Sequence, residues 1–356
     1  MNYYSKFLNI YCKRKEIVFL IFAFLLSVNT FSQILLPFKS QMNGKYGYIN
    51  ESGDIVISAK YYKVNPFYDG IALVDQGLER YYINSTGKII YKPTEPADLY
   101  DFSCGFGRVA TRTGTFFIDI NGKIRSPKYY GTKSFSENLA IIRKENKIYA
   151  INKSFQLLFE IEVDVMNLGD YFGMFNDGMM PVKNINDEWG YIDVEGKIVI
   201  KPLFRYPGRF SNGYAIVRDL KGLWCVIDKT GKIIYELKFD DYSDWPEYQA
   251  FIHNDYVVYR PKRGIIKVVK LIENIDKEFK FPKLSNDYDD NIRPKLLGEY
   301  IFYDGNTFDF DGNIIWKVDK YFGRDDIVYY NNYILIDASS NEMQLYKYDG
   351  TKINLP

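Results

Sequence analysis

Short runs of alternating apolar residues, separated by polar turns that contain glycine, recur along most of the chain. Apolar side chains fall on every second position in segments such as Ile71–Val74 and Ala215–Val217. A period of two is typical of a β-strand, because successive side chains point to opposite faces of a sheet. No comparable helical periodicity is found between residues 34 and 233. The pattern therefore predicts an all-β protein.

The first recurring motif reads aromatic–Ile–Asp/Asn–x–x–Gly–Lys–Ile. Its copies span residues 48–55, 82–89, 117–124, 191–198 and 226–233, and their glycines are 34 or 35 residues apart where copies are consecutive. We interpret the motif as a strand, a hairpin turn and the next strand. The Asp or Asn side chain accepts a backbone N–H, and the glycine takes the positive φ that a β-carbon resists. A structural turn role is predicted for Asn50, Gly53, Asn84, Gly87, Asp119, Gly122, Asp193, Gly196, Asp228 and Gly231.

A second motif, Phe–x–x–Gly–x–Ala–x–Val, recurs with the same period. Copies span residues 67–74, 102–109, 135–142, 175–182 and 210–217, and we take residues 245–252 as a degenerate copy. Two motifs in fixed phase indicate a tandem repeat. Each unit of about 35 residues is expected to be a three-stranded antiparallel meander followed by a connector. Residues 34–252 hold well-formed repeats, and residues 253–356 hold degenerate ones.

A unit of this size cannot bury its apolar face alone, so neighbouring units must pack together. Radial closure produces a propeller, whereas linear stacking produces a β-solenoid or an open curved array. About eight or nine units are legible in the sequence. We expect the propeller-like arrangement, because closure protects the edge strands. The solenoid remains the alternative.

The N-terminal residues differ from the repeats. Residues 1–32 combine a basic start, the apolar run Ile17–Val28 and a polar end, which is the layout of a secretory signal peptide. The apolar run is short for a membrane-spanning helix, so we expect cleavage rather than a retained anchor. Residues 33–356 are then one repeat domain that is secreted, periplasmic or at the cell surface. No stable membrane span is expected after signal removal.

Composition excludes several classes of function. The chain has 46 basic and 45 acidic residues, and removal of the leader makes it mildly acidic, which argues against nucleic-acid binding. A single histidine excludes most histidine-based metal sites and catalytic triads. Cys104 and Cys225 fall in different motifs and are expected to be separate thiols. We predict no cofactor, no metal and no catalytic residue.

At this point two segments show a family resemblance. The sequence GKYGYIN at residues 44–50, and EWGYID at residues 188–193 followed by GKIVIKP at 196–202, resemble bacterial WG-repeat (KWG-repeat) proteins. Only Trp189-Gly190 is the literal dipeptide. The resemblance covers residues 34–252 well and the rest poorly. It implies a β-repeat scaffold, often secreted or surface-associated, with a binding role and without catalytic residues to carry over.

Aromatic residues outside the strand motifs are the candidate ligand contacts, because repeat proteins often bind through their connectors. These residues are Tyr61, Tyr62, Tyr68, Tyr129, Tyr130, Tyr171 and Tyr206. The motif aromatics are expected in the core instead. Acidic clusters at residues 240–244, 287–290 and 304–312 are interpreted as turns or solvated faces rather than as calcium sites.

We therefore expect a secreted, non-catalytic β-repeat scaffold that binds a protein or a polysaccharide at the cell envelope. Two alternatives remain open. One is a secreted glycan hydrolase that uses a pair of carboxylates, and the other is a purely structural component of the envelope.

Overall fold

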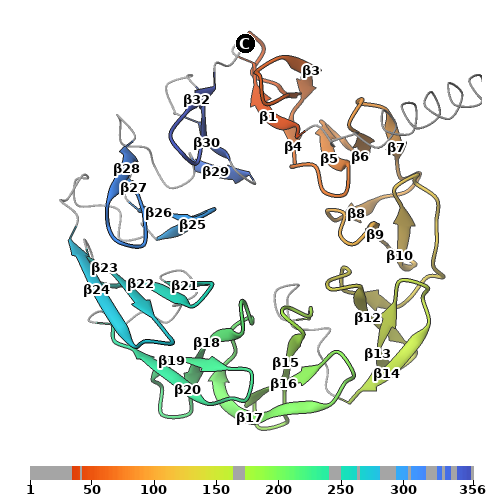
Figure 1. The fold of residues 1–356 in the computed structure, drawn as a ribbon. Helices are drawn as coiled ribbons and strands as arrows, with labels where there is room; N and C mark the ends of the chain where they lie inside the picture. The colour runs from red at the N-terminus through yellow and green to blue at the C-terminus, as the bar shows by residue number, and fades with distance from the viewer. Residues whose placement is uncertain are drawn as a thin grey trace, which may run out of the picture.

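Small antiparallel sheets follow one another around a ring in the computed structural model (Figure 1). Every regular element within the described residues is a β-strand. The predicted all-β class and the propeller-like arrangement are confirmed. Residues 1–32, which carry the expected export signal, lie outside the described residues. The structure describes residues 34–40, 42–162, 173–239, 250–262, 265–280, 294–303, 306–317, 327–330, 333–337 and 343–353.

The first four sheets have three or four strands each, and strands that are consecutive in the sequence are antiparallel neighbours. They are formed by β1 (Leu36–Lys39), β2 (Tyr46–Ile49) and β3 (Ile55–Tyr61); β4 (Lys63–Val64), β5 (Ile71–Gln76), β6 (Glu79–Asn84) and β7 (Ile89–Tyr91); β8 (Ala97–Leu99), β9 (Phe106–Thr111) and β10 (Gly114–Asp119); and β11 (Gly131–Thr132), β12 (Leu139–Lys144), β13 (Lys147–Asn152) and β14 (Leu157–Ile161).

The fifth sheet has six strands because one long strand belongs to two meanders. Ile198 and Ile200 at the start of β17 pair with β16, whereas Phe204 and Tyr206 near its end pair with β18. The sheet is formed by β15 (Met179–Lys183), β16 (Trp189–Asp193), β17 (Ile198–Tyr206), β18 (Tyr214–Asp219), β19 (Trp224–Asp228) and β20 (Ile233–Leu237).

The last three sheets have four strands each. They are formed by β21 (Ala250–His253), β22 (Tyr256–Lys262), β23 (Ile265–Lys270) and β24 (Ile275–Lys280); β25 (Lys295–Leu297), β26 (Tyr300–Tyr303), β27 (Asn306–Phe308) and β28 (Ile314–Lys317); and β29 (Ile327–Tyr330), β30 (Tyr333–Asp337), β31 (Met343–Lys347) and β32 (Lys352–Ile353). With the six-stranded sheet counted as two meanders, the described residues form nine units, which we number 1 to 9 in chain order.

Apolar clusters lie between consecutive units rather than inside them. Units 5 and 6, for example, share a cluster in which Tyr191 packs with Phe210 and Ala215. Nine such clusters occur among the described residues, one for each junction around the ring. The cluster of Leu36 and Phe38 with Leu345 joins unit 1 to unit 9. The ring is therefore closed, and the solenoid alternative is wrong.

The structure also corrects the predicted unit. The connector was expected to be irregular, but in most units its end forms a fourth strand at the inner edge of the sheet. In unit 2, β4 pairs Lys63 with Asp75, and the N–H of Asn65 donates to the carbonyl of Leu73 at 2.9 Å. This strand is short and is followed by Pro66, so it lacks the alternating pattern that marked the other strands.

The degenerate second motif was also placed wrongly. Its expected copy at residues 245–252 falls partly outside the described residues, and Ala250–His253 is the inner strand β21. The turn of unit 7 comes seven residues later, at Asn254-Asp255, where His253 pairs with Tyr256. The glycine of the motif is absent there, which removed the signal that marked the other copies.

Candidate binding surface

The antiparallel meanders give the ring two distinct faces. One face carries the two-residue turns between the first and second strands of a unit and the Asp/Asn turns between the third and fourth. We call it the Asx face. The opposite face carries the turns between the second and third strands, such as residues 76–79, and the connectors between units. We call it the connector face.

The second sequence motif forms the two-residue turns of the Asx face. In unit 2, Tyr68 and Ile71 exchange both backbone hydrogen bonds, and Asp69 and Gly70 have φ values of 51° and 77°. Two consecutive residues with positive φ fit the type I′ hairpin turn, which favours Asp-Gly and Asn-Gly. The turn type was not predicted from the motif, although the dipeptide Asp69-Gly70 is its usual sequence signal.

These turns are also linked from one unit to the next. The carboxylate of Asp69 accepts the N–H of Gly105 in unit 3 at 2.7 Å, and Asp177 accepts the N–H of Gly213 in unit 6 at 2.5 Å. Glu137 makes the same bond to Gly178 at 2.8 Å. The acidic side chains of this face therefore join neighbouring units.

The first sequence motif forms the Asx turns on the same face. The Oδ1 atom of Asp119 accepts the N–H groups of Asn121 and Lys123, both at 3.0 Å. Partial burial raises the pKa of Asp119, but the hydrogen bonds from Lys123, Asn121 and Arg125 lower it more, so it lies below its ordinary value. The same side-chain bonds recur at Asn50, Asn84, Asp193 and Asp228.

The turn glycines are required for packing as well as for backbone conformation. Gly122 has a φ of 78°, and a β-carbon added there would overlap the carbonyl oxygen of Ile90 in the preceding unit. A β-carbon at Gly196 would overlap the ring of Phe159 in the same way. Gly53, Gly87 and Gly231 share the positive φ, at 89°, 80° and 85°. The Asx face is thus a closely packed structural surface.

Motif tyrosines join units through the core. The hydroxyl of Tyr48 donates to the carbonyl of Asn65 at 2.7 Å, and that of Tyr191 donates to Gly208 at 2.8 Å. Tyr82 makes the equivalent bond to Tyr100 at 2.6 Å. Each acceptor lies 17 or 18 residues further on, in the next unit. These aromatics are fully buried, as the sequence predicted.

Two of the candidate contact tyrosines are not on the surface. Tyr61 and Tyr129 are 1% and 7% exposed and lie in the clusters between units. Their predicted role as exposed contacts is wrong. Each is the first residue of a Tyr-Tyr pair, and because side chains alternate along an extended segment, the second residue of each pair points outward.

Those second residues, Tyr62 and Tyr130, are 60% and 78% exposed. They occupy the same position in units 2 and 4, since the N–H of Tyr62 donates to Asp75 at 2.8 Å and that of Tyr130 donates to Arg143 at 3.1 Å. Both lie on the connector face.

The remaining candidates are distributed elsewhere. Tyr206 pairs with Arg218, so it lies one position further along its strand than Tyr62 does. It is half-buried and packs against Trp224, with 5.5 Å between the two ring centres. Tyr68 is 44% exposed but lies in a turn of the Asx face. Tyr171 lies outside the described residues. The candidates therefore do not form one cluster, and only Tyr62 and Tyr130 are exposed aromatics of the connector face.

Tyr62 lies between the turns of two units. The Nζ of Lys45 from unit 1 is 4.8 Å from the centre of its ring, a cation–π distance. On the other side, a β-carbon added to Gly77 of unit 2 would be 3.5 Å from the ring. The exposed ring therefore lies between the turn of Lys45 and the turn of Gly77.

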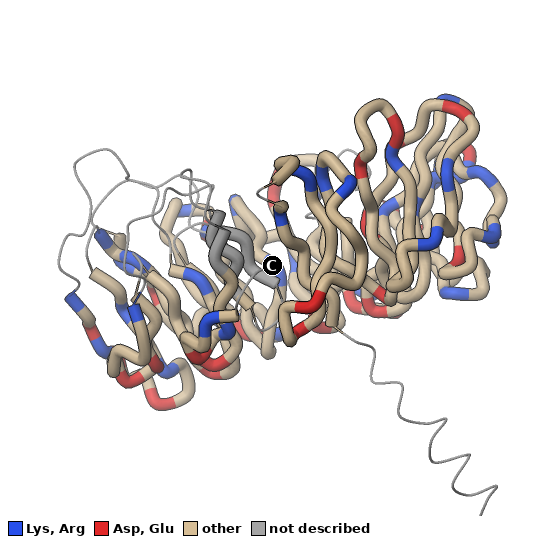
Figure 2. Tube along the Cα trace, turned by 90° about the horizontal axis from the view of Figure 1, so that it is seen from above, with Lys and Arg blue, Asp and Glu red and all other residues tan. Residues whose placement is uncertain are grey.

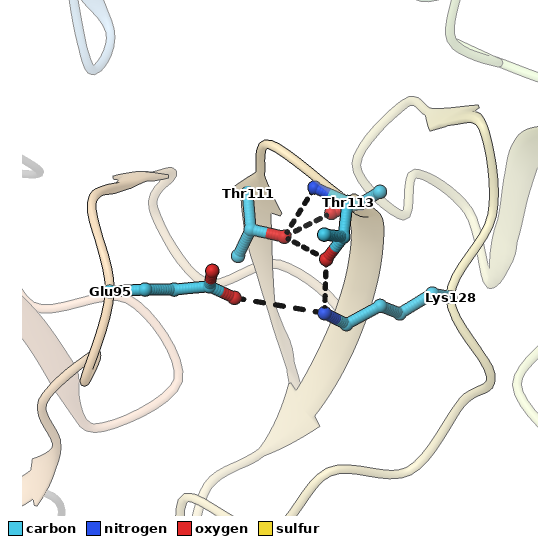
Figure 3. A network of polar contacts seen from close by, with 5 residues as sticks. Glu95, Thr111, Thr113 and Lys128 are labelled. Atoms are coloured by element: carbon cyan, nitrogen blue, oxygen red, sulfur yellow. Dashed lines mark hydrogen bonds and ion pairs between the residues drawn. The ribbon is translucent and has the colours of Figure 1, made fainter.

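Tyr130 is carried by a connector that a polar network fixes (Figure 3). The Nζ of Lys128 donates to the hydroxyl of Thr113 at 2.5 Å and lies 3.7 Å from the carboxylate of Glu95. Thr111 in turn donates to the carbonyl of Gly114 at 2.9 Å. The network joins the connectors before and after unit 3 to the turn of that unit.

Several turns on the connector face carry an exposed aliphatic residue at the tip, and these residues were not predicted from the sequence. Met42, Leu78 and Ile185 lie in the turns that join β1 to β2, β5 to β6 and β15 to β16, and they are 97%, 105% and 100% exposed. The corresponding tips of units 3 and 4 are polar, at Arg112 and Glu145. A single apolar residue in a polar turn breaks no periodicity, so the sequence pattern did not mark these tips.

The two faces differ in part in charge. Acidic residues are frequent along the lower rim of the ring in the side view of Figure 2 and also occur at its upper right. The Asx turns combine acids with Lys88, Lys123, Lys197 and Lys232. The connector face carries many exposed cations. They include Lys60, Lys63, Lys92, Arg112, Lys128, Lys144, Lys147, Lys201, Arg205 and Lys221. Acidic residues are interspersed, and several of them are paired, as Glu79 is with Lys92 at 2.6 Å.

Comparison with protein families adds independent evidence. A family model described as "WG containing repeat" matches residues 46–77, 116–147, 189–224 and 224–248. The chain contains WG repeats. A WG repeat such as residues 46–77 covers the last two strands of one unit and the first two of the next, so each repeat joins two units.

Several solved structures are similar to this chain at low sequence identity. BamB from Moraxella catarrhalis is 13% identical with a TM-score of 0.44, over 81% of this chain and 94% of that one. Sqt1 of Saccharomyces cerevisiae is 11% identical with a TM-score of 0.46, over 88% and 99%. The C-terminal WD40 domain of Sif2 is 10% identical with a TM-score of 0.42, over 88% and 95%. A search of curated proteins finds no match.

The glycine of the WG dipeptide has a clear physical cause. Opposite Gly190, strand β17 carries two extra residues, since Trp189 pairs with Phe204 but Tyr191 pairs with Ile200. This bulge lies so close that a β-carbon on Gly190 would be 2.7 Å from the backbone nitrogen of Pro202. Gly47 faces a bulge of the same type in strand β3.

Unit 6 has Cys225 at the glycine position, and there the strands pair without the extra residues. The WG repeat therefore needs glycine only where the next strand bulges. Cys225 is buried, and burial raises the pKa of its thiol to about 12, so it stays protonated. Cys104 is half-buried in unit 3, and both cysteines are free thiols.

The described residues contain no cluster of three or more metal-ligating side chains. The acidic residues 240–244 and 287–290 lie outside the described residues. Asp309 in the third acidic run holds an Asx turn, accepting the N–H groups of Asp311 and Asn313 at 2.9 and 2.8 Å.

Proposed function

We propose that this WG-repeat protein is a secreted, non-catalytic scaffold that binds a protein or a polysaccharide of the cell envelope through its connector face. The observation that carries the proposal is the exposure of Tyr62 and Tyr130 at equivalent positions of units 2 and 4. Exposed tyrosines provide large, rigid contact areas with a polar tip, and they are enriched at binding surfaces.

Contacts around these tyrosines are present before any ligand arrives. The Nζ of Lys45 lies over the ring of Tyr62, and the network of Lys128, Thr113 and Glu95 fixes the connector that carries Tyr130. Pre-ordered contacts lose less entropy on binding than mobile ones. These pre-ordered contacts therefore support a binding role for the connector face.

Export is proposed on the sequence of residues 1–32 alone. Among the described residues, no helix is both long enough and apolar enough to cross a membrane. N-terminal sequencing of the protein recovered from its host tests the proposal, with Gln33 expected as the first residue. A recovered chain that still begins at Met1 would contradict it.

The binding proposal is tested with the exported protein on a glycan array and in a pull-down from envelope extracts. The double variant Tyr62→Ala/Tyr130→Ala is compared with Tyr68→Ala, a tyrosine of the Asx face. We expect loss of the retained ligand only for the double variant. Equal retention by both variants, or no ligand for the wild-type protein, would refute the proposal.

A further inference from the structure

Three aliphatic side chains extend fully into solvent from the connector face. Met42, Leu78 and Ile185 are at least 97% exposed, whereas the other exposed aliphatic residues of the first six units are at most 64% exposed. Water around fully exposed apolar side chains is costly, so burying these three tips in an apolar medium is favourable.

The tips occur with two other kinds of side chain on the same face. Tyr62 and Tyr130 are exposed between and beside the turns, and cations surround them. Among the described residues, no ion pair involves Lys60, Arg112 or Lys221. Aliphatic tips, tyrosines and lysine or arginine side chains are the set of groups that suit an anionic lipid surface. At such a surface, aliphatic tips enter the acyl region, tyrosines lie at headgroup level, and lysine or arginine side chains contact phosphate.

The spacing of the tips favours a lipid surface over a protein partner. Leu78 and Met42 belong to adjacent units, but Ile185 belongs to unit 5, on the far side of the ring from unit 1 (Figure 1). A folded partner would need separate apolar pockets in register with these distant tips. A bilayer covers each tip from all sides without any complementary shape.

We infer that the connector face docks on an anionic lipid surface by inserting Met42, Leu78 and Ile185. The inference rests on the proposed function, because it takes the same face as the binding surface and names lipid as a component that this face contacts. Among the described residues of the Asx face, the most exposed aliphatic residue is Ile272, at 74%, and the carboxylates of that face are unfavourable near anionic headgroups.

The test is co-sedimentation of the exported protein with phosphatidylcholine vesicles, with and without phosphatidylglycerol. The wild-type protein is expected to bind mainly the vesicles that contain phosphatidylglycerol. The triple variant Met42→Ser/Leu78→Ser/Ile185→Ser is expected to lose about tenfold or more in partitioning. The matched control Ile272→Ser, on the opposite face, is expected to bind like the wild-type protein. The charge variant Lys60→Glu/Arg112→Glu/Lys221→Glu is expected to lose the preference for phosphatidylglycerol.

Circular dichroism of each variant checks that the fold is intact, since every substituted side chain is exposed. Wild-type protein that binds neither vesicle, or a triple variant that binds like the wild-type protein, would overturn the inference. If the wild-type protein binds no vesicle but retains an envelope protein or glycan through Tyr62 and Tyr130, the inference fails and the proposed function stands. If it binds vesicles through the tips but retains no protein or glycan, the inference stands and the ligand class of the proposed function fails.

Discussion

The two faces of this ring are built from turns of similar length but differ in what the turns do. On the Asx face, side chains such as Asp69 and Asp177 bond to the next unit, and glycines such as Gly122 pack against the previous one. On the connector face, Tyr62, Tyr130 and the apolar tips extend away from the protein. The comparison indicates that one face maintains the ring while the other is available to a partner.

The largest expected effect is on the Asx face. Gly122→Ala combines a positive φ with overlap of the carbonyl of Ile90, and we expect a loss of about 3 kcal/mol in the free energy of unfolding. Gly70→Ala is the matched control, because its φ is also positive at 77° but the space around it is open. It is expected to cost about 1 kcal/mol. Urea unfolding followed by circular dichroism measures both, and equal losses would contradict the packing role of Gly122.

A smaller loss is expected when a link between units is removed. Asp177→Ala deletes the bond to the N–H of Gly213 and the ion pair with Lys229 at 2.8 Å. Bonds to a charged acceptor contribute about 1.5–3 kcal/mol, but partial exposure reduces this, so we expect about 1 kcal/mol. Asp187 on the connector face provides a matched control, because its φ of 63° resembles the 53° of Asp177 and its ion pair with Lys183 at 2.7 Å is exposed. Asp187→Ala should therefore lower the urea midpoint less than Asp177→Ala does. Similar losses for both variants would remove this difference between the faces.

Acid is expected to weaken the Asx face before it affects the tyrosine sites. The pKa of Asp119 and that of Asp228 lie below their ordinary values because hydrogen bonds to each carboxylate outweigh the effect of burial. A lowered folded pKa means that the contribution to stability is complete above the unfolded pKa of about 3.9. It is lost as pH falls through the folded pKa.

Asp119→Asn/Asp228→Asn keeps the accepting Oδ1 atoms but cannot titrate. Its melting temperature should therefore fall less than that of the wild-type protein between pH 5 and pH 2 in a scanning calorimetry series. Parallel pH profiles for the two proteins would show that these carboxylates do not contribute in this way.

The repeat, its strand content and its Asx turns were predictable because they are local. An Asn or Asp, a glycine and an alternating strand fix their own geometry within a few residues, and copies at a constant period reinforce the signal. The WG glycine could not be explained from the sequence, because its cause is a bulge in the neighbouring strand β17. Closure was favoured by physical argument but needed the cluster between Leu36 and Leu345 to be established.

The candidate site was predicted only in part. The pairs at residues 61–62 and 129–130 were predicted to be connector tyrosines. Tyr61 instead ends strand β3, and alternation implies that one member of each pair points inward. Which member does so depends on pairing with the next strand, which sets Lys63 opposite Asp75, leaves Tyr62 exposed and buries Tyr61. The tips Met42 and Leu78 belong to no motif, and only their exposure in the ring identifies them.

The most direct test of the central claim compares the two faces in one experiment. Ligand retention from envelope extracts and melting temperature are measured together for Tyr62→Ala/Tyr130→Ala and for Asp177→Ala. We expect the tyrosine variant to keep its melting temperature and lose the ligand, whereas Asp177→Ala should melt earlier and keep the ligand below its melting temperature. Ligand loss in Asp177→Ala while the protein remains folded, or full retention by the tyrosine variant, would contradict it.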